Sequence, residues 1–217
     1  MTRALLLAAL LPASAVAQEF VPFRAVPDDE AFYRAVACAA PPGGECAKPF
    51  LHWPEARRAP LRVGLVSVTP ILRGPDQRRF DEGLDAAIAQ INGAGAGLRL
   101  LRDDVAPDVA IHVVPTPPDT VMEGIGVPGL DGELLQLGRV ALASRGGEIQ
   151  RGLIAISAHA PPPEVAPVLL EEVLQATGLM TDVRGPGLGR SVFSEDANAA
   201  EALSERDRMA LRRHYPG

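Results

Sequence analysis

The chain has few cysteines, few aromatic residues and almost no lysine. It contains two cysteines, and aromatic residues make up 4% of its 217 residues. Lys48 is the only lysine, and the net charge is −6 at pH 7. This acidic balance argues against binding to nucleic acid or to an anionic membrane surface. No stretch after the N-terminus approaches the roughly 20 apolar residues of a membrane-spanning helix, so we expect no membrane span.

The first residues have the pattern of a targeting segment. Arg3 precedes an apolar run at residues 4–11, and residues 15–17 read Ala-Val-Ala, a cleavage-site pattern. We therefore interpret residues 1–17 as a signal peptide. The mature protein is expected to be periplasmic or extracellular, with no lipoprotein anchor, since no cysteine follows the site.

The two cysteines lie close together in the sequence. Export favours a disulfide between Cys38 and Cys46. The loop between them contains prolines and glycines that allow the chain to fold back. Closing so short a loop contributes about 2–3 kcal/mol on the chain-entropy estimate. The alternative, a pair of zinc ligands, lacks further cysteines and nearby histidines to complete the set.

The apolar pattern predicts an α/β (α+β) domain at residues 58–217, preceded by an N-terminal extension at residues 18–57. Strands are predicted where short apolar runs rich in β-branched residues occur, and helices where apolar residues recur at helical spacing. The predicted strands are 61–68, 98–101, 109–114, 140–143 and 149–157, and the predicted helices begin near Asp28, Pro75, Glu164 and Ser204. The proline- and glycine-rich residues 115–137 are predicted to form a long loop, a candidate for the rim of a cleft.

The helix predicted from Glu164 is the most informative element. It is apolar on most of its circumference, which is typical of a central helix. It nevertheless carries Glu171, Glu172 and Gln175, and the first and last of these lie four residues apart on one face. Gly178 is expected to end the helix.

This spacing resembles the active-site helix of zincin metallopeptidases. Over residues 58–217 the resemblance implies a twisted mixed sheet of about five strands with a backing helix, an active-site-type helix and a small C-terminal subdomain. More narrowly, the stretches EEVLQATGLMTD, SVF and LSERD with a Tyr-Pro ending resemble the secreted bacterial family named domain of unknown function 2927. Membership of that family implies a fold but no particular activity.

At most positions of the peptidase motif, this chain has a different residue from the one that the motif requires. On the helix, the first ligand falls on Glu171 and the general base on Glu172. The second ligand falls on Gln175 and the helix-ending glycine on Gly178. Beyond the helix, the third ligand falls on Thr181, beside Asp182, and the methionine beneath the metal falls on Phe193. Only the base and the glycine are retained. Catalytic zinc needs three protein ligands, and a base without metal-activated water has no nucleophile to serve. We therefore expect no zinc-peptidase activity and assign no metal or cofactor.

Two functions follow from this pattern. The first is a pseudoenzyme that uses its cleft or edge strand to bind a peptide or protein in the cell envelope. The alternative is a metal-dependent hydrolase or peptidase with Glu172 as base and a hard cation held by Glu171, Asp182 and His159. A purely structural envelope component is a third possibility. In the simplest interpretation of the helix, Glu171 and Gln175 bond to neighbouring loops and Glu172 faces solvent.

Overall fold

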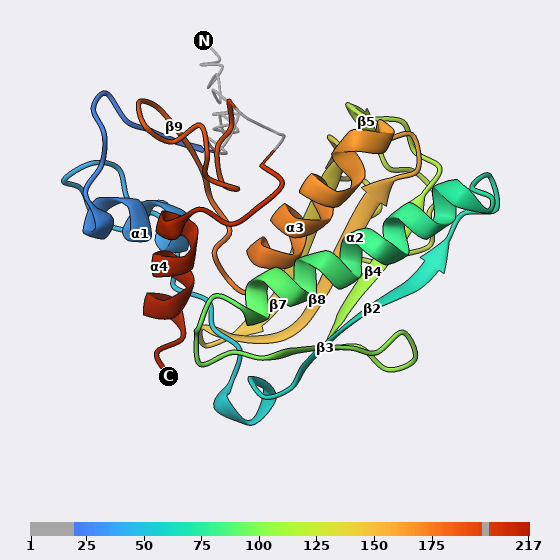
Figure 1. Ribbon diagram of the computed structural model, residues 1–217, viewed down its shortest axis with the longest axis horizontal. Helices are drawn as coiled ribbons and strands as arrows, with labels where there is room; N and C mark the ends of the chain where they lie inside the picture. Colours follow the sequence, from blue (N-terminus) through green and yellow to red (C-terminus); the bar gives the residue numbers. More distant parts are fainter. Residues whose placement is uncertain (1–19, 197–199) are drawn as a thin grey trace, which may run out of the picture.

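A five-stranded mixed sheet forms the centre of the protein in the computed structural model, which describes residues 20–196 and 200–217 (Figure 1). The predicted signal peptide lies outside these residues. The strand order is β3-β2-β4-β8-β7. All neighbours are parallel except β7, which pairs with β8 in the antiparallel sense. The strands are β2 (Leu61–Val68), β3 (Leu100–Arg102), β4 (Val109–Val114), β7 (Gly138–Arg145) and β8 (Glu148–Ser157).

The central strands form where apolar, β-branched residues cover both faces. In β4, Val109, Ile111 and Val113 are buried in the main core, as expected for a parallel strand covered on both sides. The predicted bounds of β2 and β4 are confirmed. Strand β7 is longer than predicted, because a two-residue turn at Gly146 and Gly147 joins it to β8. Both glycines have positive φ, the geometry such hairpins require.

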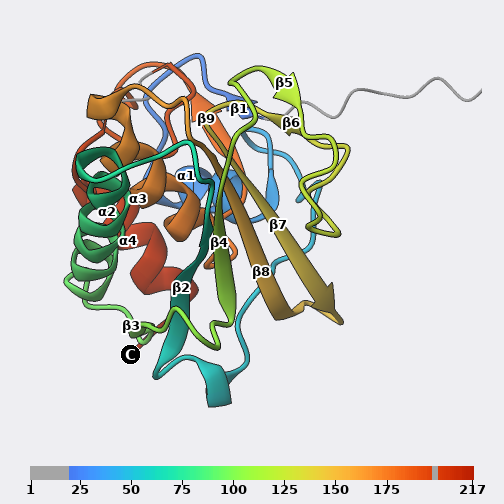
Figure 2. The same ribbon diagram turned by 90° about the vertical axis from the view of Figure 1, so that its right-hand side faces the viewer.

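Two helices cover one face of the sheet. Helix α2 (Pro75–Asn92) and helix α3 (Val165–Gln175) lie side by side there (Figure 2). They approach closely at Gly83, where a Cβ atom would stand 2.8 Å from Cδ1 of Leu169. Most of α3 is buried, so the prediction of a central helix is confirmed.

Residues 115–137 cover part of the opposite face, near β7 and β8 (Figure 2). The sequence predicts a plain loop there, but the segment contains a short antiparallel pair, β5 (Thr120–Val121) and β6 (Leu134–Leu135). Its side chains Met122 and Leu130 are fully buried in a second, smaller apolar cluster. Isolated apolar residues between glycines have no periodicity, which explains why the sequence did not show this packing.

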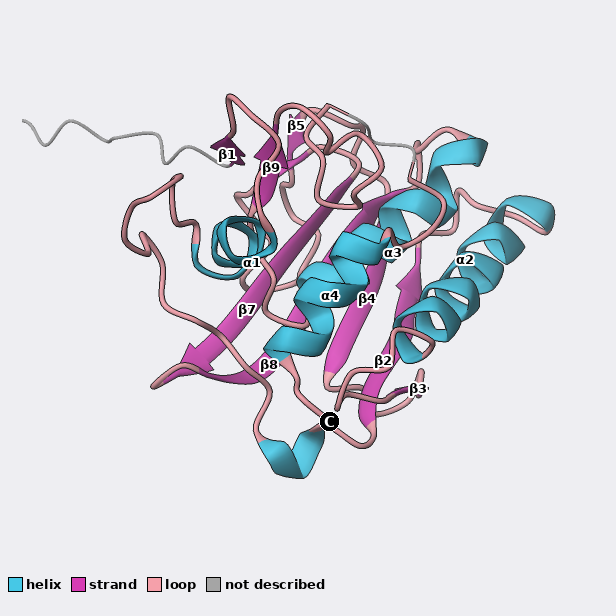
Figure 3. Cartoon of the chain, turned by 60° about the vertical axis from the view of Figure 1, so that its left-hand side comes forward, coloured by secondary structure: helices cyan, strands magenta, loops and turns pink. Residues whose placement is uncertain are grey.

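The N-terminal segment packs against the C-terminal part of the chain. Strand β1 (Phe20–Pro22) pairs in parallel with β9 (Asp182–Arg184), close to helix α1 (Asp29–Cys38), as Figure 3 shows. Helix α1 contacts the last helix, α4 (Glu205–His214). Side chains of the N-terminal segment, among them Phe32, belong to the same apolar core as α2 and α3.

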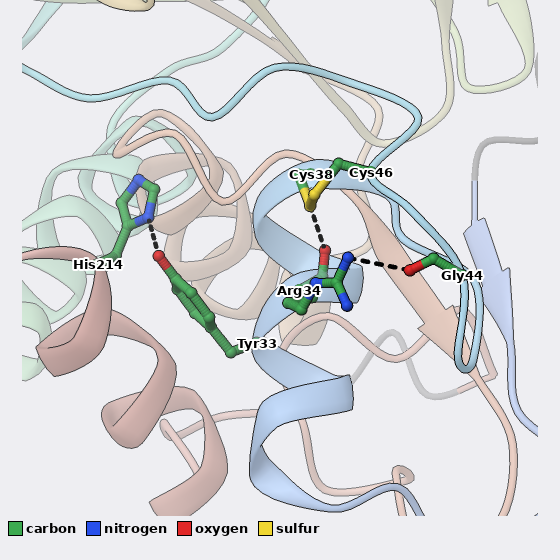
Figure 4. The surroundings of a disulfide bond; sticks show 6 residues. All are labelled: Tyr33, Arg34, Cys38, Gly44, Cys46 and His214. Carbon is green, nitrogen blue, oxygen red and sulfur yellow. Dashed lines mark hydrogen bonds between the residues drawn. A yellow bond between two sulfur atoms is a disulfide. The ribbon is translucent and has the colours of Figure 1, made fainter.

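Cys38 and Cys46 lie at disulfide-bonding distance, with their Cα atoms 5.1 Å apart (Figure 4). Ala39 adopts a left-handed conformation and ends α1 just before this loop. A guanidinium nitrogen of Arg34 donates to the carbonyl oxygen of Gly44 at 2.9 Å, which fixes the loop against the helix. Among the described residues, no helix combines the length and apolar composition needed to cross a membrane.

Candidate functional site

An acidic cavity of about 270 Å³ lies where α3, the start of β7 and the start of β9 meet. Half of its lining residues are aspartate or glutamate. They come from five separate parts of the chain, so only the folded protein brings them together. The lining residues are Pro118, Asp119, Gln136, Leu137, Gly138, Val168, Glu171, Glu172, Asp182 and Glu195.

Glu172 is the most buried acid of the cavity. Its side chain is 6% exposed and lies against the backbone of Gly138, where a Cβ atom would be only 2.2 Å from Oε1. The glycine is therefore required for this contact. The Oε2 atom of Glu172 has no hydrogen-bond partner among the described residues. The expectation that Glu172 faces solvent is wrong, because β7 begins two residues earlier than predicted and covers it.

The cavity disfavours negative charge. Burial, together with the nearby negative charges of Asp182 and Glu195, raises the pKa of Glu171 to about 8. Burial likewise raises the pKa of Glu172 well above its usual range, with added repulsion from Glu171 and Asp182. The positive charge of Arg139 opposes this shift for Glu172 without cancelling it. Such a site favours either protonated carboxyl groups or a bound cation.

The wall opposite α3 is fixed by contacts between distant segments. Gln175 donates from Nε2 to Oδ1 of Asp182 at 2.9 Å, so it does bond to a neighbouring segment, although the partner begins strand β9 and does not lie in a loop. Asp182 begins β9 and is paired in register with Phe20 of β1. Glu195 lies 3.7 Å from a guanidinium nitrogen of Arg184, an ion pair at the outer rim.

Two of the predicted motif positions, Gly178 and Thr181, are structural and do not line the cavity. Gly178 has φ +107°, and a Cβ atom there would be 2.0 Å from the carbonyl oxygen of Leu51. The helix itself ends earlier, at Gln175. Thr181 is buried, and its N–H donates to the carbonyl oxygen of Val36. These residues hold the turn after α3 against the N-terminal segment.

Phe193 and His159 also lie outside the cavity lining. Phe193 is fully buried, with its ring centroid 6.3 Å from that of Phe32. The imidazole Nε2 of His159 is 3.0 Å from the carbonyl oxygen of Pro115. Within residues 20–196 and 200–217, no group of three or more His, Cys, Asp or Glu side chains is arranged to hold a metal ion. The donor set of the hydrolase alternative does not converge, and we derive no catalytic step through a metal.

Strand β7, at whose first residue the cavity lies, forms an edge of the sheet. In the part of the chain that the structure describes, β8 is its only strand partner within the sheet. The N–H of Ser157 donates to the carbonyl oxygen of Leu137 at 2.9 Å, and these residues are opposite in register. Because backbone groups alternate in direction along an antiparallel pair, the N–H and C=O groups of Gly138, Val140 and Leu142 point away from β8.

Three residues of the cavity were not predicted from the sequence. Asp119 lies within the predicted loop, Gly138 lies between that loop and the strand predicted at 140–143, and Glu195 lies in a connection without periodicity. The one available signal was the length of residues 115–137, which marked them as a cleft rim. Comparisons with protein-family models and with the sequences of curated proteins find no match for this chain.

Proposed function

We propose that this protein is an exported, zincin-like domain that binds an extended peptide segment along β7 and has no zinc-peptidase activity. The observation that carries the proposal is that β7, beside the acidic cavity, is an edge strand whose sheet partner within the described residues is β8 alone. The signal-peptide pattern of residues 1–17 supports export. The order of elements and the retained Glu172 support the zincin resemblance and the narrower resemblance to domain of unknown function 2927.

Binding would proceed by addition of a strand. Backbone groups of Gly138, Val140 and Leu142 point outward and would exchange hydrogen bonds with a peptide main chain. Side chains alternate between the two faces of such an added strand. Those on the helix side, near the first residue of β7, face the cavity wall formed by Glu171 and Glu172. Main-chain bonds would give affinity, and the cavity would give selectivity.

The proposal predicts that binding depends on the outward N–H of Leu142. A displayed library of random decapeptides would be selected against the protein, and the affinities of recovered peptides measured by calorimetry. Leu142→Pro removes that N–H without removing a hydrogen bond to β8. It should weaken binding about tenfold or more, since one main-chain bond and the strand geometry are lost.

Leu142→Ala is the matched control, because it shortens the same side chain and keeps the N–H. It should bind peptides nearly as well as the unchanged protein. Circular dichroism would establish that both variants are folded. Failure to recover any peptide from a diverse library, or equal affinities for the two variants, would overturn the proposal.

A further inference from the structure

The cavity contains a buried acceptor that the protein itself leaves without a hydrogen bond. Glu172 is 6% exposed, and its Oε2 atom has no partner among the described residues. Buried polar atoms are nearly always satisfied, so such an atom in a residue that lines a cavity points to a ligand with a donor group. No lysine, arginine or histidine is among the described residues that line the cavity.

The size of the cavity restricts the ligand. Small-molecule sites in proteins span roughly 300–1,000 Å³, so a cavity of about 270 Å³ suits one side chain better than a whole metabolite. A metal ion would need several carboxylates to converge on one point, and the described side chains form no such group. An extended cation that reaches separate carboxylates fits this lining better than a metal ion does.

We propose that the cavity binds the guanidinium group of an arginine in the peptide strand that pairs with β7. This inference rests on the proposed function and names the side chain that the site selects. A guanidinium group is planar, carries five N–H donors and stays charged even when it is buried. It can donate to Oε2 of Glu172 and, with its remaining N–H groups, to the carboxylates of Glu171 and Asp182 on the adjoining walls.

The electrostatics of the cavity agree with this assignment. Five acids from four segments line one small space, and Arg184, which pairs with Glu195, is not among the described residues that line it. Burial, with repulsion between neighbouring acids added, raises the pKa values of Glu171 and Glu172, and Arg139 opposes this only in part for Glu172. Charge-assisted hydrogen bonds from a guanidinium would compensate the negative charge of these acids, and they are about twice as strong as neutral ones.

The test removes the charge of the peptide's arginine side chain while keeping the shape of that side chain. Each arginine of a recovered peptide is exchanged for citrulline, which has the same outline and no charge, and affinities are measured by calorimetry. At one position the exchange should weaken binding about tenfold or more, because a desolvated charge-assisted contact is lost. In the variant Glu172→Gln the same exchange should change affinity about threefold or less.

Glu82→Gln is the matched control. Glu82 is an exposed glutamate on α2, away from the cavity, and its variant should keep the full preference for arginine over citrulline. If Glu172→Gln does not fold, Glu171→Gln replaces it, since Glu171 is only partly buried. The citrulline exchange in the unchanged protein decides the question without any variant.

A second probe separates this inference from the proposed function. Nα-acetyl-arginine-methylamide carries the guanidinium but is too short to form a strand, and its binding can be followed by NMR. If peptides bind but citrulline serves as well as arginine, the inference is wrong while strand addition stands. If no peptide binds and the small arginine probe does, with loss in Glu172→Gln, the cavity assignment stands and strand addition is wrong. Absence of both kinds of binding overturns both.

Discussion

Glu171 and Glu172 are neighbours on α3 that have different surroundings. Glu172 lies against the backbone of β7, whereas Glu171, which also lines the cavity, remains partly exposed. The pKa of Glu171 is raised from 4.5 to about 8, first by burial and then by Asp182 and Glu195. Because the folded state binds this proton more tightly than the unfolded state, stability must depend on pH at this residue.

We expect the free energy of unfolding to fall as the pH rises from 5 to 8. The folded pKa lies above the unfolded one, so the contribution of Glu171 is present in full below pH 4.5 and lost as the pH passes through about 8. After allowance for solvent at the cavity mouth, the loss should be about 1–3 kcal/mol. Urea unfolding at pH 5, 6, 7 and 8 would measure it.

Glu171→Gln should make this dependence less steep, because the amide does not titrate, while Glu172, whose pKa is also raised, still contributes. Glu82→Gln, on the exposed side of α2, should leave the slope of the unchanged protein. A slope in Glu171→Gln as steep as that of the unchanged protein would show that Glu171 is not the titrating group.

At the scale of the elements, one carboxylate fixes the start of α4 and the segment that supports β9. Asp207 accepts hydrogen bonds from the backbone N–H and the hydroxyl of Ser204, at 2.8 and 2.7 Å, which completes the predicted capping box. It also accepts from the hydroxyl of Ser191 at 2.5 Å and from the N–H of Val192 at 3.1 Å. The next residue, Phe193, accepts from Val183 of β9, so Asp207 indirectly supports the cavity wall.

Asp207→Ala should destabilise the protein by about 2–4 kcal/mol. The variant loses a helix cap and leaves buried donors of Ser191 and Val192 without an acceptor. Thermal or urea unfolding would measure the change. Glu205→Ala, in the first turn of the same helix, removes an exposed acid and should change stability by about 0.5 kcal/mol or less. Similar losses in the two variants would contradict the role assigned to Asp207.

The sequence predicted the elements with strong local patterns and missed those that depend on tertiary pairing. Strand β4 and the cap of α4 were predicted at their observed residues, since an apolar β-branched run and a capping box are local signals. Strands β1 and β9 are three residues each and form only because they meet in the folded chain. In the site, the helical spacing indicated Glu171 and Glu172. It could not indicate Gly138, whose role depends on how closely β7 approaches α3.

At the scale of the whole molecule, the segment around Trp53 and the end of α4 meet at the turn after α3. The indole N–H of Trp53 donates to the carbonyl oxygen of Ala176 at 2.9 Å. The hydroxyl of Tyr215 donates to the carbonyl oxygen of Thr177 at 2.5 Å and accepts from the N–H of Trp53 at 3.0 Å. These bonds satisfy carbonyl groups at the end of a buried helix. The N-terminal segment is thus part of the support for the candidate site.

Trp53→Ala should lower the free energy of unfolding by about 3–5 kcal/mol, because it opens a cavity and leaves the carbonyl of Ala176 without a donor. Circular dichroism is the suitable measurement, since Trp53 is the only tryptophan and fluorescence would be lost with it. Phe50→Ala, which truncates a 36% exposed ring in the same segment, should cost about 1 kcal/mol or less. Equal losses in the free energy of unfolding for the two variants would show that Trp53 does not join the N-terminal segment to the turn after α3.

Because Gly138 has no side chain, its backbone lies directly between the acidic cavity and the outer edge of β7. On one side its main chain touches the carboxylate of Glu172, and on the other its amide and carbonyl groups point out from the sheet. No side chain stands between the buried acid and the outermost strand to absorb a displacement. A movement of that acid by a few tenths of an ångström would therefore pass directly into the backbone of the strand, and a chain docked on the strand would press on the acid in return.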